Sequence, residues 1–144
     1  MANITITPGT GHVNLSPTLF HAYAIQYLQC ERSFTTDAKY SPVPYFLLCR
    51  AIELELKAQH LESKSRAEVK KQYGHNLTKS YDELSSSDKT LDAREYTVLV
   101  DASKIYDVPN KGFEYVTVGD AVAGLKNFPD IAVLKRIAAK LIGQ

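Results

Sequence analysis

The chain of 144 residues contains no tryptophan, one methionine and only two cysteines, Cys30 and Cys49. Two cysteines without a CxxC spacing argue against both a disulfide framework and a zinc site. Each cysteine lies within an apolar helical run, where cysteine usually behaves as a small buried hydrophobe. We therefore expect two reduced thiols that contribute to packing.

Long apolar runs are absent as well. No stretch approaches the length that a membrane-spanning helix needs. Residues 1–17 contain neither the basic region nor the apolar region of a signal peptide. These features predict a cytoplasmic protein without a membrane partner.

The formal net charge is only +1, so no strong overall field draws the chain to nucleic acid, although a local basic patch is compatible with this value. No GxSxG, GxxxxGK[ST], GxGxxG or HExxH pattern occurs. The four histidines also lack the spacing of a helical metal pair. We therefore predict neither a metal nor a cofactor.

Helical periodicity dominates the sequence. We predict an all-α antiparallel bundle of five to six helices, with a short extended N-terminal arm over residues 1–15 and one helical domain over residues 16–144. The expected helices cover 17–33, 43–62, a segment from Ser65 to Gly74, a segment after Asn76, a segment after Ser87 or Asp88, and a segment from Pro129. Alternating side chains predict a short strand near 113–117.

The apolar faces of the first two helices predict how they pack. In the first helix a row spaced by three and four residues makes one face apolar: Phe20, Tyr23, Tyr27 and Cys30, with Leu19 and Ala24 beside them. The helix over 43–62 carries two apolar rows, so it needs packing on several sides. A symmetric second copy would cover a row that one chain leaves open, and we therefore predict a homodimer.

The helix over 43–62 also carries one polar stripe. Its members are three or four residues apart and share a face: Arg50, Glu53, Lys57 and His60. One interpretation is a solvated edge between the apolar rows. The other is a polar furrow in which Glu53 and Lys57 orient a ligand. Glu55 and Gln59 lie on another face and are expected to contact solvent.

The stretch "KKQYGHNL" at residues 70–77 ends one helical run at Gly74 and starts the next at Asn76. His75 between them has two interpretations. It can bond the terminal carbonyl groups of the preceding helix, where a protonated imidazole is stabilised. Alternatively it is a site residue, because histidine titrates near neutral pH and this corner is expected to return beside Glu53 and Lys57.

Two motifs resemble the HEPN family of small helical bundles: "FLLCRAIELELKA" at residues 46–58, and "GHNL" at residues 74–77. The resemblance implies a helical bundle that often dimerises. Many HEPN proteins are metal-independent ribonucleases of toxin–antitoxin, defence or RNA-processing systems, and many are partnered with a nucleotidyltransferase. Their catalytic signature is an arginine followed, after four to six residues, by a histidine.

The sequence departs from that signature. Arg66 lies too far before His75, and Lys70 occupies the position with the expected spacing. Lysine lacks the planar fork with which arginine holds a phosphate group. The departure favours a non-catalytic or weakly active relative.

Three functional hypotheses follow. The first is a module that binds nucleic acid, a nucleotide or a partner protein such as an antitoxin. The second is a ribonuclease in which His75 is the general acid or base and Lys70 or Lys71 stabilises the phosphorane. The third is a purely structural dimerisation module. The candidate residues are His75 and Lys70 for catalysis, and Arg50, Glu53, Lys57, Lys71 and Asn76 for binding.

Overall fold

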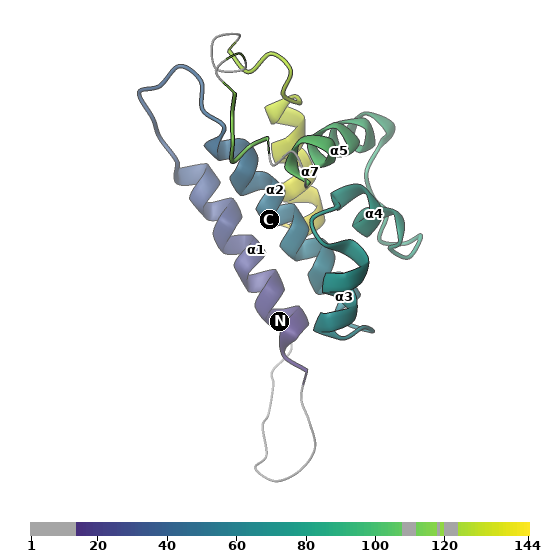
Figure 1. The fold of residues 1–144 in the computed structure, drawn as a ribbon. Helices are drawn as coiled ribbons and strands as arrows, with labels where there is room; N and C mark the ends of the chain where they lie inside the picture. The colour runs from purple at the N-terminus through teal and green to yellow at the C-terminus, as the bar shows by residue number, and fades with distance from the viewer. Residues whose placement is uncertain (1–13, 108–111, 118, 120–123) are drawn as a thin grey trace.

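The structure is a computed structural model that describes residues 14–107, 112–117, 119 and 124–144. Within these residues the regular secondary structure is entirely helical, which confirms the predicted all-α bundle (Figure 1). The six described helices are α1 (Ser16–Ser33), α2 (Val43–His60), α3 (Arg66–Tyr73), α4 (Leu77–Asp82), α5 (Ala93–Tyr106) and α7 (Ile131–Ile142).

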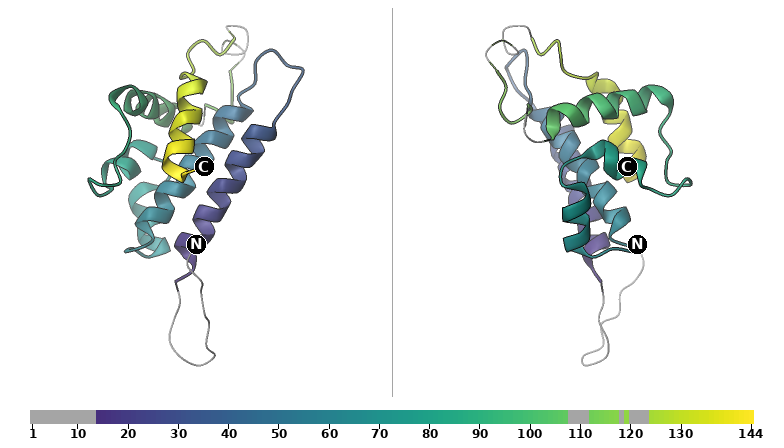
Figure 2. Two further views of the ribbon diagram at one scale, coloured as in Figure 1. Left: turned by 180° about the vertical axis from the view of Figure 1, so that it is seen from behind. Right: turned by 45° about the vertical axis from the view of Figure 1, so that its right-hand side comes forward.

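Helix α2 forms the centre of the bundle. It lies side by side with α1 in the antiparallel sense and also contacts α4, α5 and α7 (Figures 1 and 2). Its side chains from both apolar rows are therefore buried within one chain, among them Leu48, Ile52, Leu54 and Leu56. The packing of α2 thus does not itself require a second copy, and the homodimer stays a prediction that needs a different surface.

The predicted apolar face of α1 is only partly confirmed. Ala24 of that face and Leu28 are fully buried against the rest of the bundle, whereas Tyr23 is 45% exposed and Cys30 is exposed. The small side chain of Ala24 allows α1 and α2 to approach closely, so Ala24 and not the larger Tyr23 is buried in the contact. Phe20 and Tyr27 are half-buried at the edges of the contact.

The first residues of α3 and α5 show which side chains cap these two helices. Ser65 and Glu68 form the predicted capping box at α3. At α5 the predicted caps Ser87 and Asp88 were wrong, because they lie in a surface turn. The cap of α5 is Asp92, whose side chain accepts a hydrogen bond from the Glu95 amide while Glu95 accepts from the Asp92 amide.

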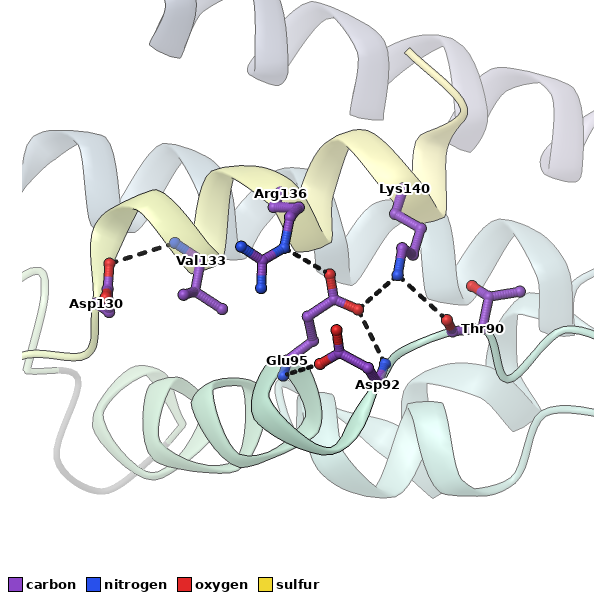
Figure 3. Close-up of polar contacts among 7 residues, drawn as sticks. All are labelled: Thr90, Asp92, Glu95, Asp130, Val133, Arg136 and Lys140. Carbon is purple, nitrogen blue, oxygen red and sulfur yellow. Dashed lines mark hydrogen bonds and ion pairs between the residues drawn. The ribbon is translucent and has the colours of Figure 1, made fainter.

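Glu95 also joins α5 to α7 (Figure 3). Its side chain is fully buried and lies 2.9 Å from Arg136 Nε and 2.6 Å from Lys140 Nζ. Burial opposes ionisation of Glu95, but the bonds from Lys140, the Asp92 amide and Arg136 outweigh it and lower its pKa to about 2. This cluster fixes the last helix of the bundle.

The predicted strand near 113–117 was wrong. Residues 112–117 form turns and irregular backbone, and Phe113 is buried against Tyr45 with 5.3 Å between the ring centroids. The alternating side chains over 113–117 therefore reflect one buried ring, that of Phe113, and not the hydrogen-bond ladder of a strand. Most of the predicted arm over 1–15 lies outside the described residues, but Asn14 Nδ2 donates a hydrogen bond to the Leu61 carbonyl. None of the helices described is both long and apolar enough to cross a bilayer.

Candidate functional site

The turn between α3 and α4 brings His75 back beside α2. Gly74 ends α3 with φ of +52°, a region that glycine adopts without a Cβ clash, and Asn76 caps α4 through its side-chain oxygen. Within this turn His75 Nδ1 lies 2.6 Å from Glu53 Oε2. Glu53 is 2% exposed, whereas 49% of the His75 side chain is exposed. The predicted proximity of these two residues is confirmed.

Glu53 is the common partner of three basic side chains. Besides His75 it pairs with Arg50, and its Oε1 lies 3.7 Å from Lys57 Nζ. Burial lowers the pKa of Lys57 below its ordinary value, although Glu53 opposes that shift. Three basic side chains, two from α2 and one from the turn between α3 and α4, therefore share one buried carboxylate.

Two tyrosines complete the environment of Arg50. Burial of Arg50 opposes its charge, but Glu53 and hydrogen bonds with Tyr27 and Tyr106 raise its pKa above the ordinary value. Burial, reinforced by Glu53, also raises the pKa of Tyr106, so its hydroxyl stays protonated. The rings of His75 and Tyr106 meet edge to face at 5.9 Å. Arg50 is thus held as a permanent cation.

A groove of about 770 Å³ lies over this cluster. We call it the basic groove. Its described lining combines apolar side chains with five basic ones, and the lining residues are Phe20, Arg50, Leu54, Lys57, Leu61, Arg66, Ala67, Val69, Lys70, Gly74 and His75. No carboxylate belongs to this described lining, because the carboxylate of Glu53 is buried beneath it. An anion that enters the groove meets cations without a competing exposed acid.

The structure separates the predicted site residues into two groups. Arg50, Lys57, Lys70 and His75 line the groove, with Glu53 below them. Lys71 and Asn76 are outside the lining, and Asn76 instead accepts a hydrogen bond from the Lys79 amide at the start of α4. The geometry brings the catalytic and binding candidates together, and their chemical roles stay predictions.

His60 does not continue the polar stripe into the groove. It is buried, its Nε2 lies 2.7 Å from the Ser80 carbonyl oxygen, and its ring stacks on Tyr73 at 4.2 Å. The expectation that Glu55 contacts solvent was also wrong, because Glu55 is 7% exposed and its Oε2 lies 2.6 Å from His21 Nδ1.

Arg66 was missed as a groove residue. It lies four residues before Lys70 on α3, so both side chains occupy the same helix face. That spacing was visible in the sequence. What was not visible was the packing of Val69 and Tyr73 against Leu61 and Phe20, which turns this face of α3 toward α2.

Among the described residues no group of three or more His, Cys, Asp or Glu side chains is placed to hold a metal ion. Comparison with family models, with curated proteins and with solved structures finds no match.

Proposed function

We propose that the basic groove binds phosphate groups of a nucleic acid or a nucleotide. The observation that carries the proposal is the composition of the described lining, in which every titratable side chain is basic. In a chain of net charge +1 this is a local concentration of positive charge, offset in part by the buried Glu53 carboxylate beneath the lining. Cations that line a concave surface attract anionic ligands and raise their association rate.

The chemistry of the lining suits a phosphate group, which carries several acceptor oxygens. Arg66 offers a planar guanidinium fork that can contact two phosphate oxygens at once, and Arg50, already bonded to Glu53, adds a fixed positive charge. Lys57, Lys70 and His75 add N–H donors around the same space. The two motifs that resemble HEPN proteins supply Arg50, Lys57 and His75, so the proposal keeps the RNA-related role that this resemblance implies.

The experiment measures binding of a fluorescent single-stranded RNA by anisotropy across a salt series. Lys70→Ala is compared with Lys71→Ala, since both side chains are exposed on α3 and only Lys70 lines the groove. Lys70→Ala is expected to weaken binding and to reduce the salt slope by about 0.7, the value for one lost contact to single-stranded phosphate. Equal effects of the two variants, or no binding at low salt, would contradict the proposal. Competition by a free nucleotide tells whether a strand is needed.

A ribonuclease is the second candidate, and one observation favours it. Because Nδ1 of His75 is bonded to Glu53, Nε2 is left toward solvent, and a carboxylate partner stabilises the imidazolium that forms. In such a reaction Nε2 takes the proton of the ribose 2′-hydroxyl, O2′ bonds to phosphorus and the P–O5′ bond breaks. The leaving oxygen takes a proton from Lys70 or water.

Cleavage of labelled RNA in EDTA tests this candidate. His75→Ala is expected to abolish metal-independent cleavage while RNA binding falls only a few-fold, since four other basic side chains line the groove. If wild-type protein binds RNA and leaves it intact, the binding function stands alone. If His75→Ala lowers only the free energy of unfolding, with binding and cleavage unchanged, His75 is structural.

A further inference from the structure

Two tyrosines of α1 and two residues of α2 border a second groove. This groove has a volume of about 390 Å³, and we call it the tyrosine groove. The residues that line it are Tyr23, Gln26, Tyr27, Cys30, Arg50 and Leu54. Its described walls are mainly apolar and aromatic, and among the described lining residues Arg50 alone carries a charge.

The two grooves are neighbours. Arg50 and Leu54 of α2 line both of them, so a ligand that contacts Arg50 in the basic groove lies beside the tyrosine groove. The basic groove offers cations, and the tyrosine groove offers aromatic rings. A ligand that fills both must join an anion to a flat apolar group over a short distance.

The two tyrosines have different roles in this groove. The Arg50 guanidinium lies over the Tyr27 ring at 5.9 Å from its centroid, so Tyr27 helps to hold Arg50. Tyr23 makes no ring–ring or cation–ring contact within the described part of the chain, and 45% of it is exposed. An exposed aromatic ring without a partner provides a face for stacking.

The surroundings of Tyr23 favour an anionic ligand. Residues 16–30, which form most of α1, contain no Asp, Glu, Lys or Arg, so no carboxylate on this stretch repels a phosphate group bound near Arg50. Gln26, one turn from Tyr23, is exposed and carries both a hydrogen-bond donor and an acceptor. These groups can bond the polar edge of a base whose face lies on Tyr23.

We propose that the tyrosine groove is a nucleobase-stacking site, which makes the ligand a single-stranded nucleic acid. An unpaired base stacks on Tyr23 while an adjoining phosphate group binds Arg50. Stacking on aromatic side chains beside a cationic groove is the general way in which proteins hold single strands, because each base offers a flat face. A base within a duplex has both faces covered by its neighbours. This inference rests on the proposed function, because it extends the phosphate site of the basic groove.

The test compares ligands with and without bases. The probes are a fluorescent oligoadenylate, the same strand in a duplex, and inorganic polyphosphate as a competitor without bases. The variants are Tyr23→Ala and Tyr23→Phe, with Tyr115→Ala as the matched control. Tyr115 is 70% exposed and lines neither groove. Thermal unfolding verifies that each variant is folded.

We expect oligoadenylate binding to depend on the aromatic ring of Tyr23 and not on its hydroxyl group. Tyr23→Ala should weaken oligoadenylate binding about five-fold or more, as expected for loss of one stacked base. Polyphosphate should displace oligoadenylate from Tyr23→Ala at the same concentration as from the wild type. Tyr23→Phe and Tyr115→Ala should bind like the wild type, and the duplex should bind more weakly than the single strand.

Each other outcome is decisive. If polyphosphate binds but Tyr23→Ala and duplex formation change nothing, the stacking site is wrong and the phosphate site stands. If neither polyphosphate nor RNA binds, both proposals fail. If Tyr23→Ala alters the sedimentation coefficient but not RNA binding, this face of α1 contacts protein, and the stacking site is overturned.

Discussion

His75 Nδ1 lies 2.6 Å from Glu53 Oε2, so a half-exposed imidazole in the turn between α3 and α4 is held by a buried carboxylate of the central helix α2. Glu53 also pairs with Arg50 and Lys57. It therefore anchors three of the five basic side chains that line the groove, although it is itself covered. Glu53 acts on a ligand only through the side chains that it positions.

We expect Glu53→Gln to lower the free energy of unfolding by about 3 kcal/mol, the cost of removing one partner from a buried ion pair. Arg50 and Lys57 would keep their charges in a largely covered position without a compensating carboxylate. Glu62→Gln is the control, because Glu62 is exposed in the turn that follows the same helix and should change stability by less than about 0.5 kcal/mol. Urea unfolding measures both. Equal losses of unfolding free energy for the two variants would show that the ion pairs of Glu53 do not stabilise the fold.

The Glu95 cluster predicts a pH-dependent stability. The pKa of Glu95 is lowered to about 2, so its stabilisation is fully present above the ordinary carboxyl value of about 4.3 and is lost as the pH falls toward 2. Glu95→Gln should therefore cost about 2 kcal/mol at pH 7, because a buried amide replaces a carboxylate with charged partners. The difference from the wild type should shrink steadily below pH 4.

Urea unfolding at several pH values follows this difference. Arg94→Ala serves as the comparison, because Arg94 is 60% exposed and its contact with Asp130 is long, at 3.7 Å. An exposed pair of this kind contributes little at any pH. A Glu95→Gln effect that stays constant between pH 7 and pH 3 would contradict the ion-pair origin of the stability.

The start of α5 gives a prediction about capping. Asp92→Ala should lower the free energy of unfolding by about 1 kcal/mol, since it removes the side chain that accepts from the Glu95 amide. Asp88→Ala should cost less, because Asp88 accepts only from Ser85 in a surface turn. Chemical denaturation of both variants compares the two positions directly. A larger loss of unfolding free energy for Asp88→Ala would indicate that Asp88, as the sequence predicted, caps the helix.

Much of the fold was predictable because its signals are local. The capping box of Ser65 with Glu68 and the glycine stop at Gly74 need only neighbouring residues, and both formed as predicted. The burial within the apolar face of α1 was not predictable, because period and hydrophobicity group Tyr23 and Cys30 with Ala24, whereas close packing on α2 buries Ala24 alone of the three. At residues 113–117 alternation could not separate a strand from a turn anchored by Phe113.

The site was predictable to the extent that it follows from helix spacing. Arg50, Glu53 and Lys57 share a face of α2 by their spacing alone, and the return of the chain placed His75 beside them. His60 has the same spacing but packs on Tyr73, because a ligand face and a packing face can follow one another along a single helix. The basic groove as a whole depends on how α3 docks on α2, which is a long-range contact.

Gly74 links backbone conformation to the site, and this predicts a separable effect on binding. Its φ of +52° and ψ of −118° disfavour any residue with a Cβ, yet a Cβ added there would meet no atom within 4 Å. Gly74→Ala should therefore destabilise by about 1–2 kcal/mol through backbone strain alone. To relieve that strain the turn must shift, which moves His75 relative to Glu53 and should weaken RNA binding.

Gly143→Ala is the matched control for that variant. Gly143 also has a positive φ, +78°, and open space around an added Cβ, but it follows α7 and lies outside the basic groove. It should lose about 1 kcal/mol of stability and keep the wild-type affinity for single-stranded RNA, measured by anisotropy at low salt. If Gly74→Ala likewise keeps that affinity, the groove tolerates displacement of His75. The binding energy then resides in Arg50, Arg66 and the lysines, and the pair with Glu53 serves the turn more than the ligand.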